Sequence, residues 1–316
     1  MEFNLSNIYK ILSDESGLSE SDVKIIVSNA PFRYKTYNIP KRNGGLREIS
    51  QPAKELKVLQ RIIVAKFLAN LPIHDCATAY RAGFSILSNA TPHAKSGAIL
   101  KLDFSDFFPS ITSNDWRLYC EANNIFNKQE DIDITSNILF RRKSRGSILR
   151  LAIGAPSSPI LSNILMFNFD DRICREVQKH KVSYTRYADD MTFSAKRAGN
   201  LSEIKNIFSN VIKEIKSPKL KINEEKTVFS TKKYHREVTG LVISDSGFIS
   251  IGHQRKRKIR SEIHHCLNGK LSPEDMMSLV GKIAYINSVD PSFIRSMEEK
   301  YNISLIRKIY ELINNS

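Results

Sequence analysis

The stretch SYTRYADDMTFSA, residues 183–195, decides the fold class of this chain. Polar and apolar residues alternate on both sides of Asp189 and Asp190, a pattern that is typical of a half-buried β-hairpin. Hairpin turns usually carry Asn-Gly or Asp-Gly, whereas two adjacent carboxylates repel each other unless a cation neutralises them. An acidic turn is often only solvated surface, but its position between buried strands favours a cation site.

The composition favours a folded protein that binds nucleic acid. Of the 316 residues 41% are hydrophobic, and 48 Lys and Arg against 33 Asp and Glu give a net charge of +15. This excess suits a partner with dense negative charge, such as a nucleic acid or an anionic membrane surface. No apolar run approaches the roughly 18 residues of a spanning helix, and the first residues lack the order of a signal peptide. We therefore expect a cytoplasmic nucleic-acid partner and no membrane.

The four cysteines indicate neither a zinc site nor a disulfide framework. Cys76, Cys120, Cys174 and Cys266 lie far apart in sequence, without C-x-x-C or Cys/His ligand spacing. We expect them to be reduced residues of the core.

Strand and helix patterns alternate without βαβ regularity, which predicts an α+β fold with a mostly antiparallel sheet. Helices are expected over 5–12, 19–31, 54–71, 158–177 and 201–215, and strands over 34–52 (a hairpin turning at Asn43-Gly44-Gly45), 97–103, 183–195, 219–230 and 236–243. After Gly252 the chain becomes basic and helical, which indicates a separate C-terminal subdomain.

Asp103 supplies a third carboxylate, at the end of the strand expected over 97–103. Three carboxylates that converge at strand ends can hold two Mg²⁺ ions about 3.5 to 4 Å apart, the arrangement used for phosphoryl transfer. Asp103, Asp189 and Asp190 are therefore the candidate metal ligands.

A tight turn that leads into a helix lies between the two acidic stretches, in IGAPSSPILSN (153–163). The helix start offers backbone N–H groups to an anion, and Gly154 with Ala155 permits close approach by a planar ring or a sugar. Alone, such a string is usually only a turn. Its place between two acidic strand ends favours nucleotide binding.

Six short strings resemble the motifs of one family, and the four palm motifs among them follow one another in the family's order. LDFSDFFPS (102–110), GAPSSP (154–159), RYADD (186–190) and LKINEEKT (220–227) resemble the palm motifs of reverse transcriptases. NATPH (89–93) resembles the Asn-Ala-x-x-His element of bacterial retron reverse transcriptases, and VTG (238–240) resembles their Val-Thr-Gly element. The resemblance implies a right-hand polymerase fold, with an N-terminal helical segment at 1–30, interleaved fingers and palm at 31–245, and a basic helical thumb at 246–316.

The resemblance also implies roles for residues at the polymerase site. Asp103, Asp189 and Asp190 match the catalytic metal ligands, with Asp189 the stronger candidate of the pair. Phe108 matches the ring that lies under the incoming sugar and excludes a 2′-OH, although core packing beside Phe107 is an equal alternative.

Basic residues complete the implied substrate site. Arg47 matches the arginine that grips the deoxynucleoside triphosphate, and Lys41 could assist it, or could be plain surface. Lys226 matches the lysine proposed to protonate pyrophosphate; a solvated strand-end charge is the alternative. Ile153 stands where many relatives have Gln, so we do not expect that side-chain hydrogen bond.

The two retron elements and the basic C-terminal region are expected to contact RNA. Asn89 and His93 could bind phosphate or sugar, or could instead be a helix cap and a core histidine, and Thr239 with Gly240 could form a close backbone approach or a bulge. A thumb helix would track a nucleic acid backbone with the charges of HQRKRKIR (253–260), of which we select Arg255, Lys256, Arg257 and Lys258. FRRKSRG (140–146) is a second basic patch.

These features imply an RNA-directed DNA polymerase of retron type. Such an enzyme copies its cognate structured noncoding RNA into a short branched single-stranded DNA, called msDNA, and commonly works with a separate effector protein in anti-phage defence. Two alternatives stay open: another compact bacterial reverse transcriptase, like those of group II introns, and a non-catalytic RNA-binding protein on a polymerase fold. A nucleotidyl cyclase has a related palm but no use for the basic C-terminal region.

Overall fold

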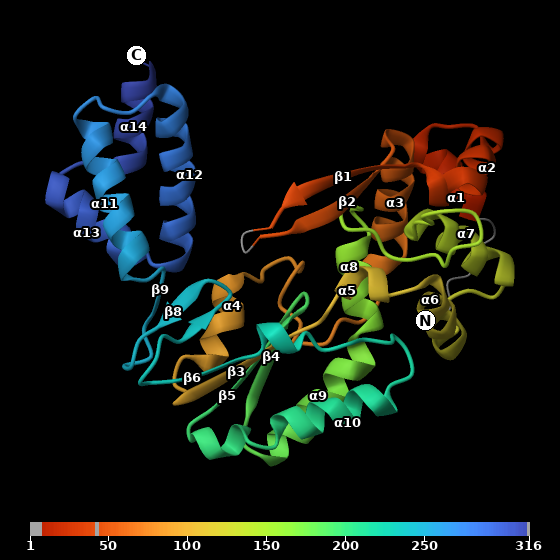
Figure 1. Ribbon diagram of the computed structural model, residues 1–316. Helices are drawn as coiled ribbons and strands as arrows, with labels where there is room; N and C mark the ends of the chain where they lie inside the picture. The colour runs from red at the N-terminus through yellow and green to blue at the C-terminus, as the bar shows by residue number, and fades with distance from the viewer. Residues whose placement is uncertain (1–7, 42–43, 315–316) are drawn as a thin grey trace.

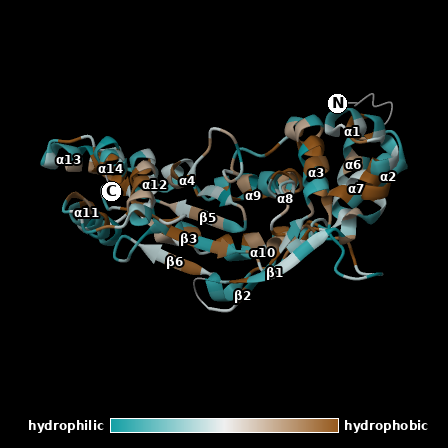
Figure 2. Ribbon diagram, turned by 90° about the horizontal axis from the view of Figure 1, so that it is seen from above, coloured by the Kyte–Doolittle hydropathy of each residue, from teal (hydrophilic) through white to brown (hydrophobic). Residues whose placement is uncertain are grey.

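The computed structural model describes residues 8–41 and 44–314 (Figure 1). Residues 5–7 of the first expected helix, and Asn43 of the expected turn, lie outside the described residues. A view from above places the C-terminal helices at one end, the N-terminal helices at the other, and the strands of the central sheet between them (Figure 2).

The N-terminal region combines helices with a long β-hairpin. Ser19 caps one of its helices, because its hydroxyl accepts a hydrogen bond of 3.1 Å from the Asp22 N–H. Its elements are α1 (Ile8–Ser16), α2 (Glu20–Asn29), β1 (Tyr34–Pro40), β2 (Leu46–Pro52), α3 (Lys54–Lys66), α6 (Ser113–Asn123) and α7 (Gln129–Leu139), with short 3₁₀ turns at Ala30–Phe32 and Leu68–Asn70.

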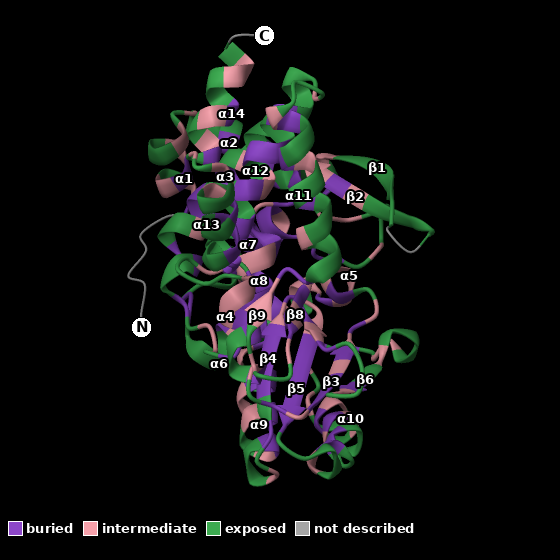
Figure 3. Cartoon of the chain, turned by 90° about the vertical axis from the view of Figure 1, so that its left-hand side faces the viewer, coloured by how far each residue is buried: buried purple, intermediate pink, exposed green. Residues whose placement is uncertain are grey.

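The β1–β2 hairpin projects from this region and is largely exposed (Figure 3). Its antiparallel register pairs Ile39 with Arg47. Gly44 and Gly45 both have positive φ, which the turn requires and which glycine adopts at little cost. The base of the hairpin is anchored by the Ser50 N–H, which donates 2.7 Å to the Ile153 carbonyl. The expected hairpin is therefore present.

The central sheet is antiparallel, with strand order β4–β5–β3–β6. Its strands are β3 (Ala98–Asp103), β4 (Ser183–Tyr187), β5 (Asp190–Ala195) and β6 (Val228–Thr231), and α9 (Phe167–Lys179) and α10 (Ile204–Glu214) cover one face. Side chains alternate along β3: Leu100 and Leu102 belong to the core under the helices, whereas Lys101 and Asp103 point to the opposite face. The sheet therefore has an apolar face toward α9 and α10, and its opposite face carries charged side chains at the Asp103 end.

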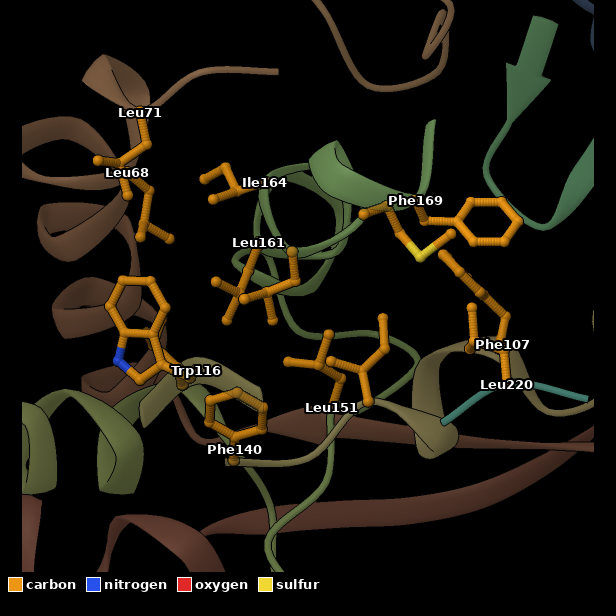
Figure 4. Close-up of a cluster of buried hydrophobic side chains, with 14 of the residues drawn as sticks. Leu68, Leu71, Phe107, Trp116, Phe140, Leu151, Leu161, Ile164, Phe169 and Leu220 are labelled. Atoms are coloured by element: carbon orange, nitrogen blue, oxygen red, sulfur yellow. The ribbon is translucent and has the colours of Figure 1, made fainter. Parts of the chain in front are cut away.

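One large apolar cluster joins the sheet to the N-terminal region (Figure 4). Each large side chain that is buried in this way contributes roughly 1.5 to 3 kcal/mol to folding. The cluster includes Phe107, Trp116, Phe140, Leu151, Leu161, Ile164, Phe169 and Leu220. Phe107 belongs to α5 (Phe107–Ser110), the short helix that follows β3.

The single helix expected over 158–177 is wrong in detail, because the chain forms two helices there. α8 (Ser158–Leu165) and α9 meet at Met166, whose ψ of −2° departs from the value of about −42° in a regular α-helix. Met166 is wholly buried, so tertiary packing between the sheet and the N-terminal region produces this bend. No glycine or proline near position 166 marks it in the sequence.

The strands expected over 219–230 and 236–243 are shorter than predicted. In the first segment only Val228 and its neighbours form β6, after a 3₁₀ turn at Glu224–Lys226. The second is a tight hairpin of β7 (Glu237–Val238) and β8 (Leu241–Ile243), to which β9 (Ile249–Ser250) adds a third strand.

The C-terminal region is a bundle with its own apolar core. It contains α11 (His253–Leu267), α12 (Pro273–Val289), α13 (Pro291–Tyr301) and α14 (Leu305–Asn314). Val238 and Leu241 of the small sheet belong to the same core, as does Ala90 of α4 (Ile86–Ala90). The bundle is thus packed on the small sheet and on α4.

The cysteines are free, and three of them (Cys76, Cys120 and Cys266) are buried as expected, while Cys174 is partly exposed. None of the helices in residues 8–41 and 44–314 combines the length and the apolar character that crossing a bilayer requires.

Candidate active site

The structure brings the three predicted carboxylates together at one end of the central sheet. Asp103 is the last residue of β3 and Asp190 the first of β5, and the register pairs them directly. Directly paired residues have Cβ atoms about 4.5 to 5.5 Å apart. Asp189 precedes β5, and its carbonyl accepts a hydrogen bond of 3.3 Å from the Phe104 N–H. Two distant segments therefore place three acidic groups side by side.

Two lysines partly neutralise this acidic group. The Lys226 ammonium lies 2.9 Å from an Asp103 oxygen, and the Lys101 ammonium lies 3.6 Å from an Asp190 oxygen. Burial raises the pKa of Asp189, and repulsion from Asp103 raises it further. Burial also raises the pKa of Asp190, where attraction to Lys101 opposes it. Carboxylates under such repulsion form the hard oxygen donor set that Mg²⁺ prefers.

A buried ion pair fixes the turn that carries Asp189. Arg186 and Asp170 are both inaccessible to solvent, and the guanidinium lies 2.6 Å from the carboxylate. Arg186 also donates 3.0 Å to the carbonyl of Ala188, a non-glycine residue with φ of 60°. A residue in this left-handed conformation needs support from its surroundings. Arg186 supplies that support directly.

A cavity of about 850 Å³ opens beside Asp189, between the hairpin and the sheet, and Asp103 and Asp190 are not among its lining residues. It contains Asp189 together with five other residues singled out from the sequence: Lys41, Arg47, Phe108, Ile153 and Lys226. An acidic end and a basic end thus face one another across a space large enough for a nucleotide.

The chain resembles known reverse transcriptases over most of its length. The family described as "Reverse transcriptase (RNA-dependent DNA polymerase)" matches residues 39–243, a span that includes all three aspartates. Retron Ec83 reverse transcriptase of Escherichia coli is 37% identical over 91% of this chain and 93% of its own length. Retron Ec86 reverse transcriptase, also of Escherichia coli, is 32% identical over 94% of this chain and 91% of its own length. The chain belongs to the retron reverse transcriptases.

The reverse transcriptase also resembles a solved polymerase structure. Telomerase from Candida albicans, solved with a fragment of telomeric RNA, aligns with a TM-score of 0.50 and 14% identity over 90% of this chain and 61% of the telomerase chain. This agreement concerns the fold alone. The fold is the right-hand polymerase fold, and the chain is an RNA-directed DNA polymerase whose family implies a divalent metal.

Phe108 lies at the boundary between this cavity and a smaller one. Its ring is 5.3 Å from that of Phe107 and 6.4 Å from that of Tyr80, measured between centroids. Phe107 is buried in the core, whereas Phe108 lines both cavities of the reverse transcriptase. Phe108 also packs against the apolar core beside Phe107, and Phe107 lines the larger cavity too, so both interpretations of Phe108 fit the structure.

Gly154 is also located at the smaller cavity, which measures about 380 Å³ and is also lined by Ala155. Its φ is +115°, and a Cβ at this position would lie 3.1 Å from the Ile49 side chain and 3.2 Å from the Ser50 carbonyl. The close approach that glycine permits is therefore made by strand β2. Because Gly154 and Ala155 also line the smaller cavity, the expected approach of a ring or sugar to this turn stays a prediction.

Asn89 and His93 of the Asn-Ala-x-x-His element are interior, which does not fit direct RNA contact by these two side chains. Asn89 and His93 have no exposed surface. Asn89 accepts a hydrogen bond of 2.8 Å from the Thr78 hydroxyl and donates 3.2 Å to the Thr239 hydroxyl. The His93 ring lies 2.6 Å from the Ser194 hydroxyl, and burial lowers its pKa to about 3. The alternative of a satisfied core histidine is what the structure has.

Thr239 and Gly240 form the two-residue turn between β7 and β8. Both have positive φ, 47° and 81°, which is the conformation of a type I′ hairpin turn. The bulge alternative is therefore wrong. Because the Thr239 hydroxyl bonds Asn89, the two retron elements form one connected structure.

The four thumb charges have different surroundings. Arg255 donates 2.7 Å to the Gly240 carbonyl, and Lys256 lies 2.6 Å from the buried Asp290 carboxylate. These two side chains are therefore used within the fold. Arg257 and Lys258 are exposed on α11 and remain suited to a phosphate backbone.

Sequence reasoning missed several residues at this site. Tyr80 lines both cavities and has φ of 61°, and it belongs to none of the motifs found in the sequence. Lys101 stands within β3, where its polar character between apolar neighbours was the available signal. Further basic residues at the large cavity are Arg141, Lys143 and Arg150, of which the first two belong to the basic patch over 140–146.

Proposed function

We propose that this reverse transcriptase copies its cognate noncoding RNA into a short single-stranded DNA that stays branched from the RNA, the product called msDNA. The observation that carries the proposal is the pairing of Asp103 with Asp190 beside Asp189, which lines a cavity together with Arg47 and Phe108. Membership among the retron reverse transcriptases supports the branched product.

The hairpin would bind the triphosphate of the incoming deoxynucleotide. Arg47 and Lys41 are exposed at the cavity, where a guanidinium fork and an ammonium match phosphate oxygens. Phe108 would lie under the sugar and exclude a 2′-OH. Gly154 and Ala155 would shape the adjoining wall, with Gly154 acting through its contact with β2.

The acidic end would hold two Mg²⁺ ions on Asp103, Asp189 and Asp190. Bound Mg²⁺ lowers the charge on the phosphates and activates the attacking hydroxyl. Lys101 and Lys226 would limit the repulsion among the carboxylates before substrate arrives. Lys226 is also the candidate for protonating pyrophosphate, since its side chain is 55% exposed at the same cavity.

We assign the regions as an N-terminal segment at 1–30, fingers and palm at 31–245, and a thumb at 246–316. Arg257 and Lys258 would contact the RNA backbone from the thumb. Arg255, Lys256, Asn89, His93 and Thr239 would contribute by holding the RNA-facing surface in shape, since each has a partner inside the protein.

Primer extension on an RNA template tests the chemistry. We expect the double variant Asp189→Asn, Asp190→Asn to lose incorporation by at least about 10³-fold, because neutral amides hold Mg²⁺ weakly. Asp133→Asn, an exposed aspartate on α7, is the matched control. Equal incorporation by the double variant and the parent would instead support a non-catalytic RNA-binding protein.

Sequencing of the nucleic acid that copurifies with the enzyme tests the retron product. A branched RNA–DNA species that a debranching enzyme separates supports the proposal. Unbranched DNA extended from a linear primer would favour a reverse transcriptase of the group II intron kind.

A separate effector protein and a role in anti-phage defence are part of the same proposal and are supported by the family resemblance alone. Phage plaque counts on cells that carry the complete locus test this role. The parent should lower the count and the Asp189→Asn, Asp190→Asn variant should not; equal counts would remove the defence role and leave the polymerase.

A further inference from the structure

Two cysteines that are far apart in sequence meet beside a histidine, on the helix-covered side of the palm. His74 and Cys76 lie in the loop after α3, and Cys174 lies on α9. The nitrogen and sulfur atoms that these three residues offer as ligands all lie within 4.8 Å of one another. Cys76 is buried, and the other two are partly exposed.

The donor set is that of a borderline-soft cation. Thiolate sulfur and imidazole nitrogen suit Zn²⁺, whereas Mg²⁺ takes oxygen ligands. A tetrahedral Zn²⁺ with Zn–S of about 2.3 Å separates two sulfurs by about 3.8 Å, so closing the group around an ion needs small side-chain movements. The His74 Nδ1 accepts a hydrogen bond from the Cys76 N–H that is long, at 3.3 Å, and therefore weak. A bond to a metal ion can replace it at small cost.

The protein backbone already holds the loop in place for this arrangement. The Arg186 N–H donates 2.8 Å to the Cys76 carbonyl, and the Thr78 N–H donates 2.9 Å to the Arg186 carbonyl. The His74 ring packs edge-on against Phe167 at the start of α9, with centroids 5.4 Å apart. The loop at 74–78 and the start of α9, which carry or flank the three ligands, are therefore held in place without an ion.

Zn²⁺ binding here requires the thiols to lose their protons, a step that burial opposes and that the charge of a dication offsets. Burial raises the pKa of the Cys76 thiol well above its usual range, since an isolated thiolate is poorly solvated there. A bound divalent cation compensates two thiolates completely, so the occupied group adds no net charge next to the neutral Arg186–Asp170 pair.

We propose that His74, Cys76 and Cys174 form a three-ligand Zn²⁺ site, with water as the fourth ligand, that ties the loop at 74–78 to α9. No fourth His, Cys, Asp or Glu joins this group in the part of the chain that the structure describes. Because Cys76 is bonded to Arg186, and Arg186 supports the Ala188 turn, the ion would brace the strand that leads to Asp189.

Co²⁺ titration of metal-free, reduced protein tests this site, because thiolate-bound Co²⁺ has a charge-transfer absorption. We expect about one Co²⁺ per chain in the parent, and binding weakened by at least about tenfold in Cys76→Ser, Cys174→Ser and His74→Ala. Cys120→Ser and Cys266→Ser, in the two apolar cores, are the matched controls. The signal should persist in the Asp189→Asn, Asp190→Asn variant and in excess Mg²⁺.

Alkylation of the parent protein gives a readout that needs no variant. Zn²⁺ should protect Cys76 and Cys174 from iodoacetamide at least about tenfold under mild conditions, with each cysteine read by mass spectrometry. Absence of the Co²⁺ absorption, its survival in Cys174→Ser, or a Cys76–Cys174 disulfide in protein that binds no Zn²⁺ would each overturn the proposal. Failure of the Zn²⁺ proposal would not affect the proposed role of the aspartates in polymerisation, which primer extension tests separately.

Discussion

Asp189 is held where its negative charge costs folding free energy. Burial and the neighbouring Asp103 both raise its pKa, so the folded protein binds this proton more tightly than the unfolded chain does. This unfavourable contribution to stability is fully present above the pKa of Asp189 in the folded state, and it disappears below the pKa of the same group in the unfolded chain. Function at this position therefore opposes stability.

Asp189→Asn should accordingly raise the melting temperature by a few degrees at pH 7 without added Mg²⁺, while primer extension is lost. The gain should shrink as the pH falls toward 4, since the parent carboxylate then becomes protonated and neutral. Thermal scans over this pH range measure it. A gain that stays constant with pH would show that charge is not its cause.

The Arg186–Asp170 pair makes the opposite prediction. Asp170→Asn leaves a fully buried guanidinium without its counter-charge, which should destabilise the protein by about 3 to 5 kcal/mol. Asp171→Asn is the matched control, because Asp171 lies on the same helix and pairs with Arg175, which is 70% exposed. Urea unfolding measures both variants. An equal loss of unfolding free energy in the two variants would mean that any aspartate replaced on α9 destabilises the protein, and that the buried pair has no special role.

At the scale of secondary structure, the fingers hairpin is positioned by the turn at Gly154. A Cβ there would press on β2, and its positive φ strains any other residue. We expect Gly154→Ala to raise the KM for deoxynucleotides about tenfold, with a smaller change in kcat, because Arg47 is displaced. Gly199→Ala, where a Cβ meets nothing within 4 Å, is the control. Steady-state kinetics that left KM unchanged would exclude this coupling.

Elements with a clear local pattern could be predicted from the sequence. The β1–β2 hairpin, α3, β3 and the β4–β5 hairpin follow alternating or helical periodicity, and the carboxylates at their ends could be found for that reason. The bend at Met166 could not be predicted, because packing from both sides produces it. Asn89 bonds Thr239, and Lys256 pairs with Asp290. Both partners lie more than 30 positions away in the sequence, so no local pattern indicates these contacts.

At the scale of the whole molecule, the thumb and the palm have separate apolar cores that meet around the two retron elements. The hydrogen bond from Asn89 to Thr239 joins α4 to the small sheet beneath the thumb. The exposed charges of α11 therefore stand on a base that is fixed to the palm.

Removing two of these exposed charges should weaken RNA binding without changing the chemistry. The double variant Arg257→Gln, Lys258→Gln should reduce the slope of log affinity against log salt by up to about 2, since each phosphate contact releases about one counterion. Lys300→Gln with Lys308→Gln, on α13 and α14, serves as the equal-charge control. Filter binding at several salt concentrations measures the slopes. Identical slopes for the two double variants would mean that only net charge matters.

The direct pairing of Asp103 with Asp190 also limits which insertions and deletions the gene can accept. Successive side chains of a strand point to opposite faces, so losing one codon between positions 98 and 102 would turn the Asp103 carboxylate toward α9 and α10. A library of single-codon deletions should therefore contain active clones with shortened surface loops and none with a shortened β3, even where the deleted residue never touches substrate.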